Sequence, residues 1–127
     1  MLDTSVFIAS ESGRPLDVER LPRESAISAV TVAELHVGVL AAKDLPARAR
    51  RLATLEAVAD IELLPVDAQV AASWALLRVH VAQANRKVNV NDLWIAATAL
   101  AHGVPVVTQD DDFGAIDGAG GLVVVHV

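Results

Sequence analysis

The chain has 127 residues, of which 54% are hydrophobic and 3% aromatic, and it carries a formal net charge of −6 and no cysteine. This length and hydrophobic content predict one domain, residues 1–127, with a sizeable core. The lack of cysteine excludes a disulfide framework and any thiolate metal site, and the acidic balance argues against general binding of polyanions by the whole surface.

The scarcity of aromatic residues leaves Ala, Val, Leu and Ile to build the core, which suits parallel strands covered by helices. We therefore expect an α/β fold. No stretch approaches the ~20 apolar residues that a membrane helix needs, and the amino terminus lacks a basic region followed by a long apolar run. These features predict a soluble, cytoplasmic protein with no membrane partner.

The first half of the chain alternates between β-prone and helical segments. Thr31 and Glu34 have the spacing of a capping box at the start of a helix, and Pro46 stands where another helix begins. The predicted elements are a short strand within residues 1–9 followed by a loop or helix, a turn at 12–15, a strand at 26–30, a helix from 31 to about 43, and an amphipathic helix at 47–59.

The second half continues this alternation. Trp74, Leu77 and Val81 recur at helical spacing, and His102 and Gly103 mark the end of a nearly all-apolar helix. The predicted elements are a strand at 61–66, a helix at 67–84, a polar loop at 85–87, a helix at 93–101 opened by 91–92, a strand at 104–108 and a final edge strand at 122–127. Such alternation predicts a parallel, doubly wound sheet with right-handed crossovers.

Acidic residues follow the predicted strands or begin the predicted helices. Asp3 alone is compatible with an Asx turn, Glu34 with a capping box, and Asp92 with a favourable charge at a helix start. A run of acids such as Asp110 to Asp112 is usually solvated. Ligands of parallel α/β sheets bind beyond the carboxyl ends of the strands, so we expect these acids to converge there.

Asp92 is the only acid on its apolar helix, and a dry, unpaired carboxylate would cost several kcal/mol. A cluster of carboxylates needs a cation to offset its repulsion, and an all-oxygen site suits Mg²⁺, for which Mn²⁺ substitutes. Such a site without a nearby nucleophile is typical of metal-assisted phosphodiester hydrolysis. The bound metal would supply the positive field that the acidic chain lacks.

Basic residues and histidines carry weaker signals. Arg86 and Lys87 are possible RNA contacts, although exposed basic residues in loops are commonplace. Three arginines of the 47–59 helix are equally weak candidates for RNA contact; they are Arg48, Arg50 and Arg51. The four histidines lack the spacing of a metal-binding pair, and we assign them no role; they are His36, His80, His102 and His126.

Four motifs, in this order and spacing, together resemble the PIN-domain family over essentially the whole chain, and in particular the VapC-type toxins of bacterial toxin–antitoxin pairs. They are Asp3-Thr4-Ser5, Thr31 to Leu35 with Gly38, Asn91-Asp92 followed by residues 94–99, and residues 107–113. The resemblance implies a three-layer fold with a central, mainly parallel sheet flanked by helices. Only two residues precede Asp3, fewer than is usual in PIN domains, so we expect either a short first strand or a native chain that starts earlier than this sequence.

The resemblance also implies the roles of individual residues. The metal-binding and catalytic acids would be Asp3, Glu34 and Asp92, with Asp110 first and Asp112 second for the remaining position, while Asp111 faces solvent. Three small hydroxyl residues would support the acids or a metal-bound water; they are Thr4, Ser5 and Thr108. The implied function is that of a Mg²⁺-dependent endoribonuclease toxin that cleaves transfer or ribosomal RNA, forms a homodimer and is inhibited by a VapB-type antitoxin whose tail covers the site.

Two other readings remain open at this point. A magnesium-dependent phosphoacceptor or phosphatase domain would also gather acids at strand ends, but it needs a lysine at a late strand end, and none lies near Thr108. A phosphatase would further want an acid at Ser5. A catalytically inactive PIN-like binding module would keep the fold, although it need not keep every acid.

Overall fold

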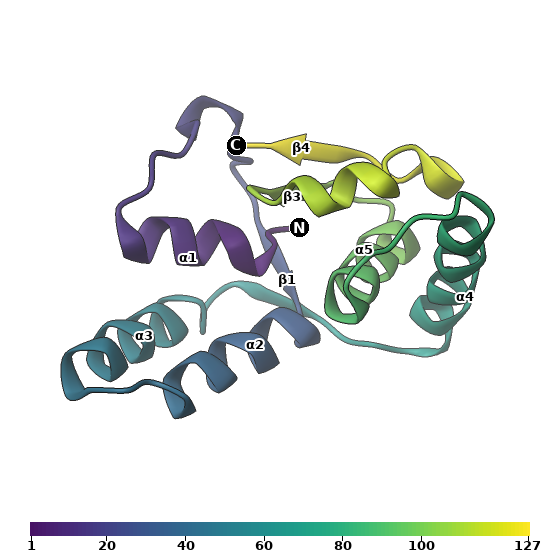
Figure 1. The fold of residues 1–127 in the computed structure, drawn as a ribbon. Coiled ribbons are helices and arrows are strands. Elements are labelled where there is room, and N and C mark those ends of the chain that lie inside the picture. The colour runs from purple at the N-terminus through teal and green to yellow at the C-terminus, as the bar shows by residue number, and fades with distance from the viewer.

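Short parallel strands alternate with longer helices along the chain, as a computed structural model of residues 1–127 shows (Figure 1). The helices are α1 (Thr4–Ser12), α2 (Ala29–Leu40), α3 (Leu45–Ala57), α4 (Ala68–Gln83) and α5 (Val90–His102). The strands are β1 (Ala26–Ser28), β2 (Glu62–Leu64), β3 (Val106–Thr108) and β4 (Val124–His126). Three 3₁₀ turns complete the chain: η1 (Val18–Arg20), η2 (Asp111–Ala115) and η3 (Ala119–Gly121). None of the helices is long and apolar enough to cross a membrane.

The sheet is parallel throughout. β2 pairs with β1 and β3 pairs with β4, and Leu2 joins the two pairs because it bridges Ile27 of β1 and Val107 of β3. The order across the sheet is therefore β2, β1, the Leu2 segment, β3 and β4, with β4 at an edge as expected. All strand carboxyl ends lie along one side of the sheet, which confirms the predicted parallel α/β architecture.

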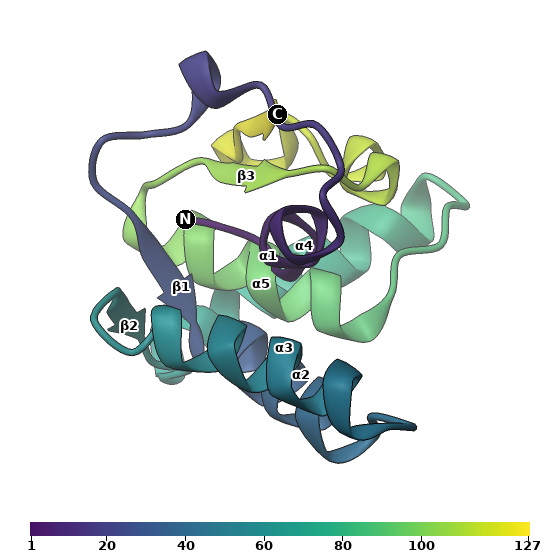
Figure 2. The same cartoon turned by 90° about the vertical axis from the view of Figure 1, so that its left-hand side faces the viewer.

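Two hydrophobic clusters lie on opposite faces of this sheet. Leu2 and Val107 belong to a cluster with residues of α1 and α2, whereas their neighbours Met1 and Val106 belong to a larger cluster with α4 and α5. Successive side chains of a strand point to opposite faces, so the sheet is the middle of three layers. Figures 1 and 2 show α1, α2 and α3 on one side and α4 and α5 on the other.

The prediction of a strand within residues 1–9 is right only for the first residues. Leu2 is the single bridging residue, and the chain becomes helical at Thr4 because the Asp3 side chain caps α1 by accepting a hydrogen bond from the Ser5 amide. The helix ends at Gly13, whose φ of 68° lies in the left-handed region that favours glycine. Asp3 thus joins a strand end directly to a helix start.

The predicted capping box of Thr31 and Glu34 is wrong. The second helix begins two residues earlier, at Ala29, and its cap is Ser28, whose hydroxyl accepts a 2.9 Å hydrogen bond from the Thr31 amide. Thr31 is fully buried inside the helix. Glu34 therefore lies in the second turn of α2, where its carboxylate has no capping duty and is available to other partners.

The remaining elements agree with the sequence-based expectation in type and order, with ends shifted by a few residues. The cap of α3 is Asp44, that of α4 is Asp67 and that of α5 is Asn89, and Gly103 ends α5 as predicted. Leu77 and Val81 are buried in the larger cluster, and Trp74 packs against it. β1 is short because its last residue, Ser28, also caps α2.

Candidate metal centre

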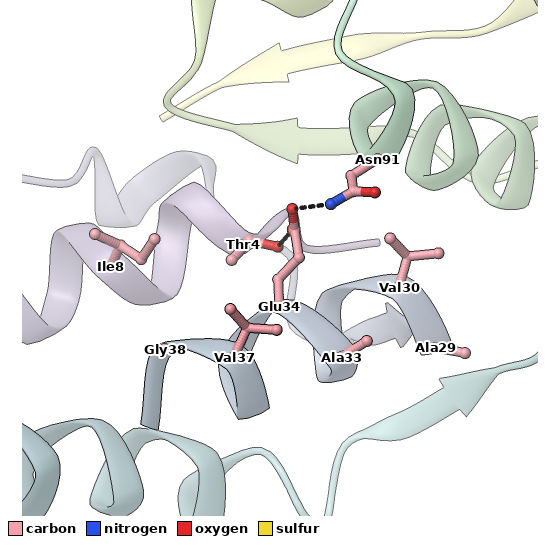
Figure 3. A pocket seen from close by; sticks show the side chains of 9 residues that line it. All are labelled: Thr4, Ile8, Ala29, Val30, Ala33, Glu34, Val37, Gly38 and Asn91. Carbon is pink, nitrogen blue, oxygen red and sulfur yellow. Dashed lines mark hydrogen bonds between the residues drawn. The ribbon is translucent and has the colours of Figure 1, made fainter. Parts of the chain in front are cut away.

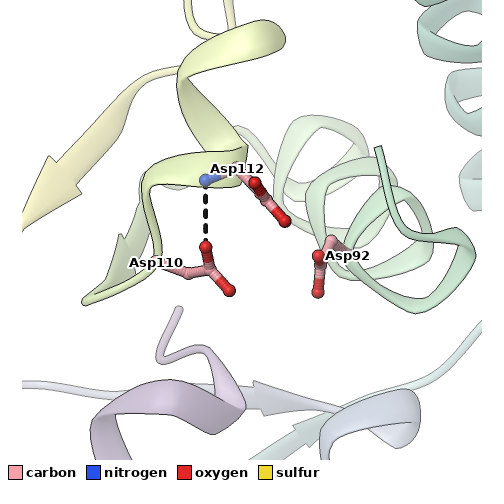
Figure 4. Close-up of side chains that lie close together, drawn as sticks. All are labelled: Asp92, Asp110 and Asp112. Carbon is pink, nitrogen blue, oxygen red and sulfur yellow. Dashed lines mark hydrogen bonds between the residues drawn. The ribbon is translucent and has the colours of Figure 1, made fainter. Parts of the chain in front are cut away.

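Three carboxylates meet beyond the end of β3. Carboxylate oxygens of Asp92, Asp110 and Asp112, one from each residue, all lie within 4.8 Å of one another (Figure 4). Asp92 comes from the first turn of α5, and the other two come from the turn η2 that follows β3. The Asp110 carboxylate accepts a 2.9 Å hydrogen bond from the Asp112 amide, which fixes the spacing of these two acids.

The electrostatics of Asp92 extend the cluster to five acids. The pKa of its half-buried carboxyl is raised to about 7. The largest cause is burial, followed by the charges of Asp3, Asp110, Glu34 and Asp112, in that order. No basic side chain offsets these effects. Four carboxylates therefore act on Asp92, and this repulsion would be relieved by a cation among them.

Asp3 is 3% exposed and firmly held. Its Oδ2 accepts hydrogen bonds from the Ser5 hydroxyl at 2.6 Å and the Thr108 hydroxyl at 2.9 Å. The Thr108 hydroxyl also accepts a bond from the Asp110 amide at 2.9 Å, and the Ser5 hydroxyl accepts one from the Gln109 amide at 2.9 Å. These bonds tie Asp3 to the loop that carries the Asp110 cluster.

Glu34 is held from two other helices. Its Oε2 accepts a 2.5 Å hydrogen bond from the Thr4 hydroxyl of α1, and its Oε1 accepts a 2.8 Å bond from the Asn91 side-chain amide of α5 (Figure 3). It is not one of the three acids that approach within 4.8 Å, but it faces the same centre, because its charge acts on Asp92.

Asn91 is the site residue that our reading of the sequence missed. From the sequence, the motif Asn91-Asp92 indicates only the start of a helix and forms part of the family resemblance. The two side chains leave the first turn of α5 about 100° apart, so one reaches Glu34 while the other joins the aspartate cluster. The sequence feature that could have identified Asn91 is a side-chain amide next to an isolated acid at the start of a helix.

The residues predicted for the site fall into two groups. The five acids and the three hydroxyl residues gather around one point, whereas Arg86 and Lys87 lie exposed on the loop between α4 and α5. Asp111 is exposed, and no histidine joins the acidic cluster.

A pocket of about 640 Å³ opens beside Glu34 between α1 and α2 (Figure 3). Most of its lining is apolar, with Ile8 and Val37 as the largest exposed side chains, and Thr4 and Asn91 at the Glu34 end. The carboxylate of Glu34 therefore stands at the boundary between an apolar hollow and the acidic cluster.

The donor set matches a hard divalent cation. Every candidate ligand is a carboxylate oxygen, which Mg²⁺ and Mn²⁺ prefer, and zinc or copper would call for imidazole or thiolate ligands that the cluster lacks. The pKa of Asp92 is raised by burial and by its acidic neighbours, so a divalent cation at this position would stabilise its charged form. The residues present thus fit a cation.

Comparison with known proteins gives concordant results. The model of the family described as "PIN domain" matches residues 1–119. Ribonuclease VapC5 of Mycobacterium tuberculosis is 58% identical over 127 residues, which cover 100% of this chain and 94% of that protein. Ribonuclease VapC4 of the same organism is 44% identical over 117 residues, covering 91% of this chain and 89% of that protein.

The fold is also similar to that of solved toxin–antitoxin structures. A chain in the crystal structure of VapBC-5 from Mycobacterium tuberculosis, described as a member of the VapBC family of toxin–antitoxin systems, superposes with a TM-score of 0.93 and 55% sequence identity. The match covers 99% of this chain and 96% of that one.

Proposed function

The chain belongs to the PIN-domain family, and from this membership we propose that it is a metal-dependent endoribonuclease acting as the toxin of a toxin–antitoxin pair. Its 58% identity to a relative named a ribonuclease supports the activity. The observation that carries the proposal is the convergence of Asp3, Glu34, Asp92, Asp110 and Asp112 at one edge of the sheet. Nothing else in the chain gathers groups able to hydrolyse a phosphodiester.

The proposed cofactor is Mg²⁺, with Mn²⁺ as a substitute, held by Asp92, Asp110 and Asp112 together with Asp3 and Glu34. A bound divalent cation supplies stabilisation of phosphate charge and activation of water. The protein's own part is positioning. Ser5 and Thr108 orient Asp3, and Thr4 and Asn91 orient Glu34, through the hydrogen bonds described above.

The proposed substrate is a cellular RNA, transfer or ribosomal RNA in the first place. The acidic chain offers few groups to a polyanion, so the cation would supply most of the local attraction to the scissile phosphate. Arg86 and Lys87 are the proposed protein contacts to the RNA strand. Cytoplasm, where such RNA resides, is the proposed compartment.

The proposed partner is a VapB-type antitoxin, as in the toxin–antitoxin structure to which the chain is similar. We assign its inhibitory segment to the apolar pocket beside Glu34, because a segment seated there would reach the acidic cluster. Val37 is 61% exposed on the rim, so Val37→Asp should abolish antitoxin binding while leaving RNA cleavage intact. A homodimer is the proposed assembly of the toxin itself.

The alternatives are not favoured. A phosphoacceptor domain needs a lysine at a late strand end, but the last lysine of the chain is Lys87, before α5. An inactive module would not need to keep five carboxylates together at a cost in electrostatic repulsion.

The test is cleavage of total cellular RNA by the purified chain in Mg²⁺ or Mn²⁺, with EDTA and Asp92→Asn as negative controls. The proposal expects discrete fragments that need the metal and vanish in the variant. No metal-dependent cleavage by a protein shown to be folded would favour the inactive binding module instead.

A further inference from the structure

A second pocket, separate from the acidic cluster, lies where α4 meets the loop that leads into α5. It has a volume of about 290 Å³, near the lower limit of ordinary small-molecule sites, about 300 Å³. Its lining combines cationic and apolar side chains: Trp74, Arg78, Val81, Arg86, Lys87, Val88, Val90 and Leu93. We call it the basic pocket.

The charge of this pocket is out of proportion to that of the chain. The protein has a formal net charge of −6 and only 10 Lys and Arg residues. Seven of them lie between Arg14 and Arg51, and every later one, namely Arg78, Arg86 and Lys87, lines the basic pocket. All three are exposed, so their charges are available to a ligand.

The floor of the basic pocket is apolar and firm. Val81 and Leu93 are almost fully buried, and Trp74 stacks on Trp94 with ring centroids 5.0 Å apart. Cations above an apolar, partly aromatic surface match the two halves of a nucleotide, whose phosphate is anionic and whose base has an apolar face. An inorganic anion would use only the cations, and a hydrophobic ligand only the floor.

The basic pocket lies next to the metal centre. Val90 and Leu93 of its lining and Asp92 of the acidic cluster all belong to the first turn of α5. Side chains on different sides of one helical turn are separated by no more than about one helix diameter, 10 to 12 Å. A strand whose phosphate reaches the acidic cluster therefore has its neighbouring nucleotides within reach of the basic pocket.

We propose that the basic pocket binds one nucleotide of the RNA strand adjacent to the cleaved bond. Arg78, Arg86 and Lys87 hold its phosphate, and the floor around Trp74 takes its base. This inference rests on the proposed ribonuclease function. It adds to that function a positively charged subsite that compensates for the acidity of the rest of the surface and sets which segment of the strand enters the metal centre.

The experiment measures RNA binding in EDTA, where no cleavage occurs, with bulk bacterial transfer RNA as the probe. The readout is tryptophan fluorescence, because Trp74 lines this pocket and Trp94, the only other tryptophan, stacks on Trp74. The test variant is Arg86→Ala with Lys87→Ala. The matched control is Arg20→Ala with Arg23→Ala, which removes the same charge from exposed positions at the end of η1 and in the segment that follows it.

Loss of two of the three cations that hold this phosphate should weaken binding by up to about 5-fold at 0.1 M salt and lower the slope of log affinity against log salt by up to about 0.7. The control should retain the wild-type affinity. Equal affinities of the test variant and the control, or RNA binding that leaves tryptophan fluorescence unchanged, would overturn the proposal. Wild-type cleavage is measured separately in Mg²⁺, so a failure of the basic pocket is distinguished from a failure of the ribonuclease function itself.

Discussion

The carboxylates of the candidate metal centre are held in two different ways. Asp3 and Glu34 accept hydrogen bonds from hydroxyl and amide groups of other elements. The Asp92 side chain accepts none, and its pKa is raised to about 7 by burial and by its acidic neighbours. The protein alone thus fixes the positions of Asp3 and Glu34, whereas Asp92 has no such donors and its charged form would be stabilised by a cation.

This difference indicates how the fold can bring acids together at a candidate cation site while limiting the loss of stability in the metal-free protein. Two acids are anchored by donors from the chain, so their positions do not depend on the metal. Burial and repulsion destabilise mainly the charged form of Asp92, and a bound cation would offset both effects. Mutations on the anchored side and at Asp92 should therefore change the stability of the metal-free protein in opposite directions.

The largest expected effect is that of Asp92→Asn. Loss of a ligand worth several kcal/mol to a metal-assisted reaction should lower RNA cleavage by about a thousandfold, the equivalent of about 4 kcal/mol. The same variant should raise the stability of the metal-free protein at neutral pH by about 2 kcal/mol, once solvent screening of the half-buried group is allowed for. Cleavage assays and urea unfolding in EDTA measure the two effects.

The control for Asp92→Asn is Asp111→Asn, which removes an equal charge from an exposed acid in the same loop as the cluster. It should leave the cleavage rate within a factor of about two of the wild type and the free energy of unfolding within about 0.5 kcal/mol. A similar loss of cleavage in both variants would show that net charge, rather than the cluster, controls activity.

Thr108→Val tests the anchored side of the comparison. The change removes the buried hydroxyl that donates to Asp3 and accepts from the Asp110 amide, with little change in side-chain volume. We expect metal affinity to fall by about 10- to 100-fold and, unlike in Asp92→Asn, stability to fall by about 1 to 3 kcal/mol. Mn²⁺ titration calorimetry and unfolding in EDTA check both. Unchanged metal affinity would mean that the Thr108 hydroxyl does not position Asp3 for metal binding.

The pH dependence of the metal-free protein tests the Asp92 side. Because the folded state raises the pKa of Asp92, the folded protein keeps a proton that the unfolded chain loses. Stability should therefore fall as the pH rises from about 4 to about 7 and level off above that, by about 2 kcal/mol in total. Unfolding curves in EDTA should show this decline in the wild type and not in Asp92→Asn; the same decline in both would remove Asp92 as its source.

The smallest effect is expected for Asn91→Ala. This exposed amide donates a single hydrogen bond to Glu34, which Thr4 also holds, so Glu34 should lose orientation rather than charge. Metal affinity should drop about three- to tenfold with no measurable change in stability, corresponding to one hydrogen bond of about 0.5 to 1.5 kcal/mol. Asn91→Gln should recover part of the affinity. A loss of stability in Asn91→Ala would instead assign the amide a structural role.

The sequence predicted the fold where periodicity was strong, as in the helices α3, α4 and α5. It misplaced the first two helix starts, because Asp3 and Ser28 end their strands and cap the following helices at once. A β-prone composition does not show that residues 4–9 are already committed to a helix by a single side-chain cap.

The convergence of the acids could be predicted from one rule, that ligands bind beyond the carboxyl ends of parallel strands. Their partners could not. The bond from Asn91 to Glu34 spans 57 positions, and the grouping of Arg78 with Arg86 and Lys87 depends on how α4 packs beside the following loop. Such contacts are decided by tertiary packing, which the chain order of residues does not reveal.

The most direct test of a cation at the carboxylate cluster is a crystal of the protein soaked in Mn²⁺, with anomalous scattering used to locate the ion. Our account predicts a peak among the carboxylates of Asp92, Asp110 and Asp112, lost in crystals of Asp92→Asn. A peak elsewhere on the molecule, or none under conditions that support RNA cleavage, would contradict the central claim that these acids form the metal centre.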